Sequence, residues 1–164
     1  MTTRTVIGFD PGPTSHGWAL LRVDSGRPVW LASGEVPAKD YATIRALIEA
    51  ADLVAVETPK GIPYGKDLGK IRGRSRDLLA TGIEAGRLLG MASCYEVEIE
   101  QASAEEWRKA IVGKSSAADW QVKVQIRQRV MAWPLRTPVH ARDAAGMALY
   151  AHERARLLAA GVPA

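Results

Sequence analysis

The sequence has 164 residues, of which 47% are apolar, and a formal net charge of +4. This length favours one domain, because domains cluster near about 100–150 residues, and it is enough to bury a hydrophobic core. No apolar run approaches the roughly 20 residues that span a membrane, and no secretory signal precedes the first strand-like run. The single cysteine, Cys94, excludes an internal disulfide, so we expect a reducing, cytoplasmic compartment.

Basic residues gather in two segments of the chain. Segments 60–76 and 108–129 each hold six basic residues and one acid, whereas segment 95–106 is acidic. Two basic patches on a nearly neutral background favour a polyanionic partner such as nucleic acid. A solvated surface is the alternative, and charge alone does not separate the two interpretations.

The first third of the chain predicts an antiparallel meander of three strands, at 4–10, 16–23 and 28–36. A helix is expected over 39–51, where apolar residues recur on one stripe. Segment 53–57 (LVAVE) is short, apolar and ends on an acid. Such a run is typical of a central strand that is covered on both faces.

Segment 58–70 is rich in Pro and Gly and predicts an exposed loop. A long helix is expected over about 74–92, with Gly and Ala residues along one side. Segment 94–100 (CYEVEIE) alternates between apolar and polar residues and predicts a strand with one buried face.

The rest of the chain predicts three helices. The first covers 103–112 and begins with a capping box made by Ser103 and Glu106. The other two cover 117–131 and about 140–160. The resulting order, β-β-β-α-β-α-β-α-α-α, predicts an α/β fold with a mixed sheet and helices on both faces.

Four residues carry the candidate chemistry. Asp10 and Glu57 each end an apolar strand, and ligands of open α/β sheets bind in the crevice at those strand ends. His140 and Asp143 are three residues apart and therefore share one face of the last helix. Carboxylates brought together repel one another, and a hard divalent cation relieves that repulsion. Two such cations can clamp a scissile phosphate and activate a water.

Each of the four residues also has a purely structural interpretation. Asp10 could cap the Pro-Gly turn that follows it, and Glu57 could lie at the surface. Asp143 could be an acid favoured by the helix dipole, and His140 a residue of the preceding loop. Taken singly, these interpretations stay open.

With these residues placed, the chain resembles the RuvC family of Holliday-junction resolvases, within the RNase H-like nuclease superfamily. Four segments carry the resemblance, in the order of the family: GFDPGPTSHGWALL, VAVE, EEWRKAIVGKSSAADWQVK and HARDAAGMALYAH. The first resembles the "DPG" motif of the family, and the last resembles its closing "DAADALALAICH". The resemblance covers nearly the whole chain.

The resemblance implies an RNase H-like fold with a five-stranded mixed sheet, as a single domain over 1–164. It implies a catalytic quartet of Asp10, Glu57, His140 and Asp143 that holds two Mg²⁺ or Mn²⁺ ions, although most relatives carry Asp where His140 stands. It further implies a homodimer, built on the 74–92 helix, that nicks a four-way DNA junction symmetrically. A branch-migration helicase is a further candidate partner.

The chain departs from the family pattern at two positions. Relatives carry an aromatic residue where this chain has Lys60, and they carry Lys where it has Asp119. We therefore expect the two departures to alter the DNA sequence that is preferred for cleavage and the opening of the junction more than the nuclease chemistry. The residues expected to contact DNA are basic or aromatic members of the two basic segments: Lys60, Tyr64, Lys66, Arg72, Arg74, Arg76, Lys114 and Lys123.

Three other functions are compatible with part of this sequence pattern. A YqgF-like RNA nuclease belongs to the same superfamily, but such chains are shorter and lack the helices expected over 103–131. An actin-like ATPase needs two such domains, which 164 residues cannot supply. A junction-binding protein with weak catalysis is the non-enzyme alternative, and the presence of all four quartet residues disfavours it.

Overall fold

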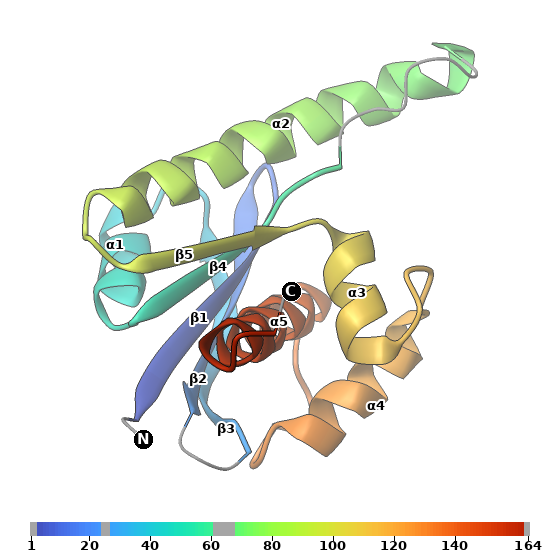
Figure 1. Ribbon diagram of the computed structural model, residues 1–164. Helices are drawn as coiled ribbons and strands as arrows, with labels where there is room; N and C mark the ends of the chain where they lie inside the picture. The colour runs from blue at the N-terminus through green and yellow to red at the C-terminus, as the bar shows by residue number, and fades with distance from the viewer. Residues whose placement is uncertain (1–2, 24–26, 61–67, 163–164) are drawn as a thin grey trace.

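A five-stranded mixed sheet forms the centre of the protein (Figure 1). The computed structural model describes residues 3–23, 27–60 and 68–162, and for residues 68–75 it describes the backbone only. The spatial order of the strands is β3-β2-β1-β4-β5, with β1–β3 antiparallel and β4 and β5 parallel to β1. The strands are β1 Arg4–Pro11, β2 Ser15–Val23, β3 Val29–Pro37, β4 Leu53–Glu57 and β5 Glu98–Ala102.

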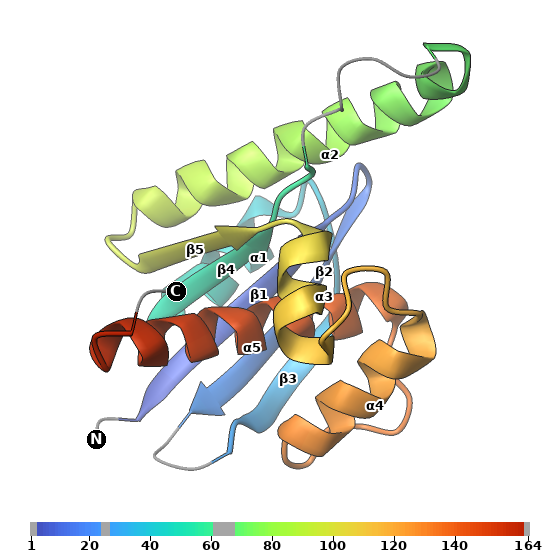
Figure 2. The ribbon, with the colours of Figure 1, turned by 45° about the vertical axis from the view of Figure 1, so that its right-hand side comes forward.

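Helices cover both faces of this sheet. They are α1 Tyr41–Glu49, α2 Leu68–Ser93, α3 Ala104–Val112, α4 Asp119–Arg129 and α5 Val139–Ala159. One buried apolar cluster joins α1 and α2 to one face, and a second joins α3, α4 and α5 to the other. Both views show that α2 runs past the edge of the sheet (Figure 2). Among the described helices, none is long and apolar enough to cross a membrane.

The predicted order of elements and the predicted fold class are confirmed, but several predicted boundaries differ from the observed ones by one to six residues. The fifth strand begins at Glu98 and not at residue 94, because the backbone of Glu96 is left-handed (φ 55°) and residues 94–95 continue the helical turn. Helix α2 begins at Leu68, six residues before the expected start, within the segment predicted as a loop. Strand β1 continues one residue past Asp10 to Pro11.

Helix α5 lies directly on the strands β1 and β2, because two glycines leave room for its backbone. A Cβ atom added to Gly8 would lie 1.9 Å from the carbonyl oxygen of Ala144, and one added to Gly17 would lie 2.2 Å from the carbonyl carbon of His140. The buried side of α5 is mostly alanine, which permits the same close approach. The N-terminal turn of α5 therefore lies beside the end of β1.

We expect Gly8→Ala to destabilise the protein by about 3 kcal/mol or more, since overpacking a rigid core commonly costs about 1–3 kcal/mol and here the clash is with backbone. The matched control is Gly90→Ala, at an exposed helical position where an added Cβ has no atom within 4 Å. That change should stabilise α2 by up to about 1 kcal/mol. Urea unfolding of both variants measures the difference, and equal stabilities would contradict the close approach of α5.

Candidate active site

Asp10 and Glu57 project from the same face of the sheet at the ends of neighbouring parallel strands. Side chains alternate along a strand, so Asp10 shares the face of Gly8, and Glu57 shares that of Ala55. Gly8 and Ala55 are paired in register between β1 and β4. This is the face that α5 covers, so the two carboxylates lie next to the N-terminal turn of that helix.

Helix α5 brings the other two predicted residues to the same place. The Nδ1 atom of His140 lies 2.7 Å from Oδ2 of Asp10. Asp143 follows one turn later and is buried, and its charge acts on both Asp10 and Glu57. The four residues Asp10, Glu57, His140 and Asp143, which we call the acidic cluster, are therefore brought together. The His140 side chain is 60% exposed and forms the open edge of the cluster.

Two residues of α3 contact the acidic cluster and were not among the predicted site residues. The indole N–H of Trp107 donates a 2.7 Å hydrogen bond to Oε2 of Glu57, and Nη2 of Arg108 donates one of 2.7 Å to Oδ2 of Asp143. The capping box of Ser103 and Glu106, which was predicted, fixes the start of this helix. This local signal marks where α3 begins, but it does not predict that Trp107 and Arg108 reach the cluster.

The pKa values of the cluster reflect burial and mutual repulsion. Burial raises the pKa of Glu57 to about 7, and the neighbouring charge of Asp10 adds to the rise. Burial is also the main cause of the raised pKa of Asp10, which the hydrogen bond to His140 partly offsets. The same hydrogen bond raises the pKa of His140. The cluster thus holds more negative charge than its surroundings stabilise.

The donor set fits a divalent cation, although the side chains are not arranged around one ion. In the part of the chain that the structure describes, no three His, Cys, Asp or Glu residues converge to hold a metal. Arg108 and Trp107 instead occupy one oxygen each of Asp143 and Glu57. The second oxygen of Asp143, Oδ1, is buried without a hydrogen-bond partner. Buried carboxylates with an unpartnered oxygen are the ligands that hard cations prefer.

The structure describes the side chains of only some of the residues that were predicted to contact DNA. Lys60 forms a 2.6 Å ion pair with Glu105, and Lys114 and Lys123 are exposed. A cavity of about 270 Å³ opens beside Glu57, between Lys60, α2 and the start of α3. Arg76 is exposed on α2. Tyr64 and Lys66 lie outside the described residues, as do the side chains of Arg72 and Arg74.

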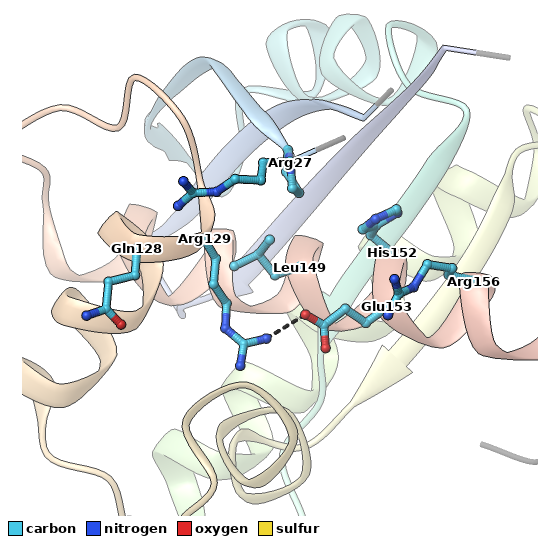
Figure 3. A pocket seen from close by; sticks show the side chains of 8 residues that line it. Arg27, Gln128, Arg129, Leu149, His152, Glu153 and Arg156 are labelled. Carbon is cyan, nitrogen blue, oxygen red and sulfur yellow. Dashed lines mark hydrogen bonds and ion pairs between the residues drawn. The ribbon is translucent and has the colours of Figure 1, made fainter. Parts of the chain in front are cut away.

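A second hollow, of about 230 Å³, lies farther along α5 (Figure 3). Arg27, Arg129, His152 and Arg156 line it, and a 2.5 Å ion pair joins Arg129 to Glu153. His152 follows the last residue of the acidic cluster by nine positions, which is about 13 Å along a helix. This basic hollow is therefore separate from the acidic cluster.

We expect the metal-free protein to lose stability as the pH rises from 4.5, the ordinary pKa of a glutamate, to about 7. In this range the folded protein keeps a proton on Glu57 that the unfolded chain has released, so unfolding becomes easier as the pH rises. Glu57→Gln should remove this part of the dependence. Urea unfolding in EDTA at several pH values measures it, with Glu98→Gln, an exposed acid at the far end of the sheet, as control. The same pH slope in Glu57→Gln and the wild type would contradict the buried position of Glu57.

Sequence comparison finds relatives over nearly the whole chain. No protein-family model matches the sequence. The crossover junction endodeoxyribonuclease RuvC of Francisella philomiragia is 23% identical over 158 residues, which cover 94% of this chain and 91% of the relative. The same enzyme of Francisella tularensis subsp. holarctica is 25% identical over the same share of each chain. The order of motifs in this chain agrees with these matches.

Structure comparison finds proteins of the same fold. A structure of Thermus thermophilus RuvC matches with a TM-score of 0.68 and 24% identity, covering 93% of this chain and 96% of the other. A structure of T. thermophilus RuvC in complex with a Holliday junction substrate matches with a TM-score of 0.73 and 21% identity, covering 94% and 96%. The predicted resemblance and the predicted RNase H-like fold are confirmed: the chain is similar in sequence and in fold to the RuvC crossover junction endodeoxyribonucleases.

Proposed function

We propose that this protein is a metal-dependent, structure-selective DNA endonuclease that resolves four-way junctions by paired symmetric nicks, within a single domain. The observation that carries the proposal is the acidic cluster, in which three acids and a histidine from three separate elements meet at one end of the sheet. Relatives of this chain are named crossover junction endodeoxyribonucleases, and one neighbouring structure contains a Holliday junction. Those names support the substrate class.

Asp10, Glu57 and Asp143 are the residues that would hold Mg²⁺ or Mn²⁺, two ions being the number that we propose. Such ions supply a nucleophilic water and stabilise the charge that develops on the phosphate. Asp143 could bind an ion through Oδ1 while Arg108 stays on Oδ2, and an ion that took both oxygens would free the guanidinium of Arg108 to contact a phosphate oxygen. Its two parallel N–H donors suit a phosphate.

His140 is the fourth proposed ligand, and its protonation decides whether it can serve. An imidazole binds a metal only when neutral, whereas the hydrogen bond to Asp10 raises the pKa of His140. A bound cation reverses that preference by repelling the ring proton. Imidazole also suits Mn²⁺ better than Mg²⁺, so we propose Mn²⁺ as the favoured ion.

DNA contact is assigned to the basic residues that flank the acidic cluster. Lys114 is exposed in the loop before α4 and Lys123 on α4 itself. Arg76 is exposed on α2, and Lys60 lines the cavity next to Glu57. Neutralising phosphates with such residues releases counterions and makes binding sensitive to salt. Lys60 is paired with Glu105 in the free protein, so its contact with DNA requires that pair to open.

A homodimer built on α2 would supply the two cleavage sites that paired nicks need. Leu79 is 66% exposed and Ile83 is 48% exposed on this helix, and Gly86 and Gly90 have open space where a side chain would be. An apolar surface flanked by glycines allows a second helix to approach closely. A branch-migration helicase is a further proposed partner, without a surface assigned to it.

A junction-binding protein with weak catalysis is the second candidate function. One observation favours it: Trp107 and Arg108 already occupy the carboxylates of Glu57 and Asp143. The two candidates differ in one measurement, which is cleavage of a labelled four-way junction with Mg²⁺, Mn²⁺ or EDTA. Binding without cleavage under all three conditions would favour the second.

We expect Asp10→Asn, Glu57→Gln and Asp143→Asn each to lower junction cleavage by more than the roughly 10–100-fold that loss of an outer-shell metal partner costs. Junction binding should persist, because it depends on the basic residues. Gel assays of cleavage and binding measure both, and Glu98→Gln, an exposed acid at the far end of the sheet, is the control. Near wild-type cleavage by any one variant would remove that residue from the site.

We expect Gly86→Leu to convert a dimer into a monomer. Among the residues that the structure describes, none outside the adjoining turns of α2 has an atom within 4 Å of a Cβ added at Gly86, so we expect the leucine to be tolerated within the protomer and to clash with a partner. Gln128→Leu, at an exposed position of α4, is the matched control. Light scattering measures the mass. A monomeric wild type under conditions in which it cleaves junctions would refute the dimer.

A further inference from the structure

Trp120 differs from every other tryptophan of the chain in its exposure. It is the second residue of α4, and it is 67% exposed. Trp107 is fully buried, and Trp18, Trp30 and Trp133 pack against the two buried clusters. Tryptophan is highly buried on average, so an indole that lies open to solvent needs a reason.

Trp120 follows a residue that ion pairs connect to the acidic cluster. Its neighbour Asp119 has Oδ2 3.7 Å from Nη2 of Arg142, and Nε of Arg142 lies 3.6 Å from Oδ1 of Asp143. Two consecutive ion pairs thus join the first turn of α4 to the cluster. A ligand bound at the acidic cluster that extended over the start of α4 would reach the indole.

The backbone that carries Trp120 is held firmly. Ala117 is buried just before the helix, and Val122 and Ile126 anchor the opposite side of α4 in the core. The side chain of Gln121 accepts a 2.9 Å hydrogen bond from the backbone N–H of Ala118 at the start of the helix. The indole is therefore presented outward from a fixed position, which lowers the entropy lost when it binds a ligand.

The surface around Trp120 is basic. Lys123 lies one helical turn away and Arg127 two turns away on the same side of α4, and Lys114 is exposed in the preceding loop. Asp119 is the single acid of α4, and it is paired with Arg142. An aromatic plane among positive charges fits a nucleic acid, whose phosphates the lysines attract and whose bases stack on aromatic rings.

We propose that Trp120 stacks on a nucleobase of the branched DNA, while Lys114 and Lys123 contact the phosphates on either side of it. This inference rests on the proposed function, because it assumes a junction as the ligand. Bases next to a branch point lose a stacking neighbour and expose a face that bases inside a duplex do not. The stack would therefore favour branched DNA over a plain duplex and help to set where the junction lies relative to the acidic cluster.

The test compares Trp120→Ala and Trp120→Phe with the wild type in EDTA, so that binding is measured without cleavage. Anisotropy gives the affinity for a four-way junction and for a duplex, and 2-aminopurine placed beside the branch point reports stacking by quenching. Loss of one base–aromatic stack corresponds to roughly 5- to 150-fold in affinity. We expect a loss in that range for Trp120→Ala on the junction, little change on the duplex, reduced quenching, and partial recovery in Trp120→Phe.

Two controls separate stacking from charge and from folding. Lys123→Gln should lower the slope of log affinity against log salt by about 0.9, whereas Trp120→Ala should leave that slope unchanged. Leu158→Ala removes another exposed apolar side chain, near the far end of α5, and should change neither affinity nor quenching. Thermal unfolding of each variant checks that it is folded.

The outcomes separate this inference from the proposed function. If the wild type binds the junction and Trp120→Ala binds it equally, with equal quenching, the stacking proposal is overturned, and the exposed indole is left as a surface for a protein partner. If the wild type shows no preference for the junction over the duplex, the proposed function and the stacking proposal both fail.

Discussion

The close approach of α5 to the sheet is the constraint on which the candidate site depends. Gly8 and Gly17 lack the side chains that would hold the helix away, and the carbonyl groups of Ala144 and His140 occupy that space. Because α5 lies this near, His140 reaches Asp10, and Asp143 is placed where its charge acts on Glu57. If α5 lay a few ångströms farther from the sheet, His140 and Asp143 would not reach Asp10 and Glu57.

The close packing of α5 on the sheet also brings negative charges together, which destabilises the ionised form of the cluster. Carboxylates from β1, β4 and α5 share a buried volume, and burial raises the pKa of Asp10 and Glu57. Helix α3 offsets part of this cost with the indole N–H of Trp107 and the guanidinium of Arg108. Gly146 makes room for that indole, since an added Cβ would lie 2.5 Å from its ring. Bound cations would take over the role of these donors.

In the proposed function, different surfaces around the cluster would carry the dimer contact and the DNA contact. Helix α2 presents exposed leucine and isoleucine beside open glycines on the sheet face opposite α5, which suits contact with a second copy. Loop 113–118 and α4 present lysines and an exposed tryptophan beside the cluster. A dimer through α2 would leave the α4 surfaces free for DNA. In the proposed function, the inward acids would bind metal and the outward bases would dock the substrate.

Much of this arrangement follows from the sequence alone. Alternation and apolar periodicity predicted the order of strands and helices, and the capping box at Ser103 marked the start of α3, because these are local signals of backbone conformation. The sequence also singled out Asp10, Glu57, His140 and Asp143 as candidates. Only the tertiary structure decided that they meet, and that Trp107 and Arg108 contact them, because those distances depend on packing between elements up to 130 residues apart. The start of β5 likewise depended on a left-handed residue, Glu96, that carries no pattern in the sequence.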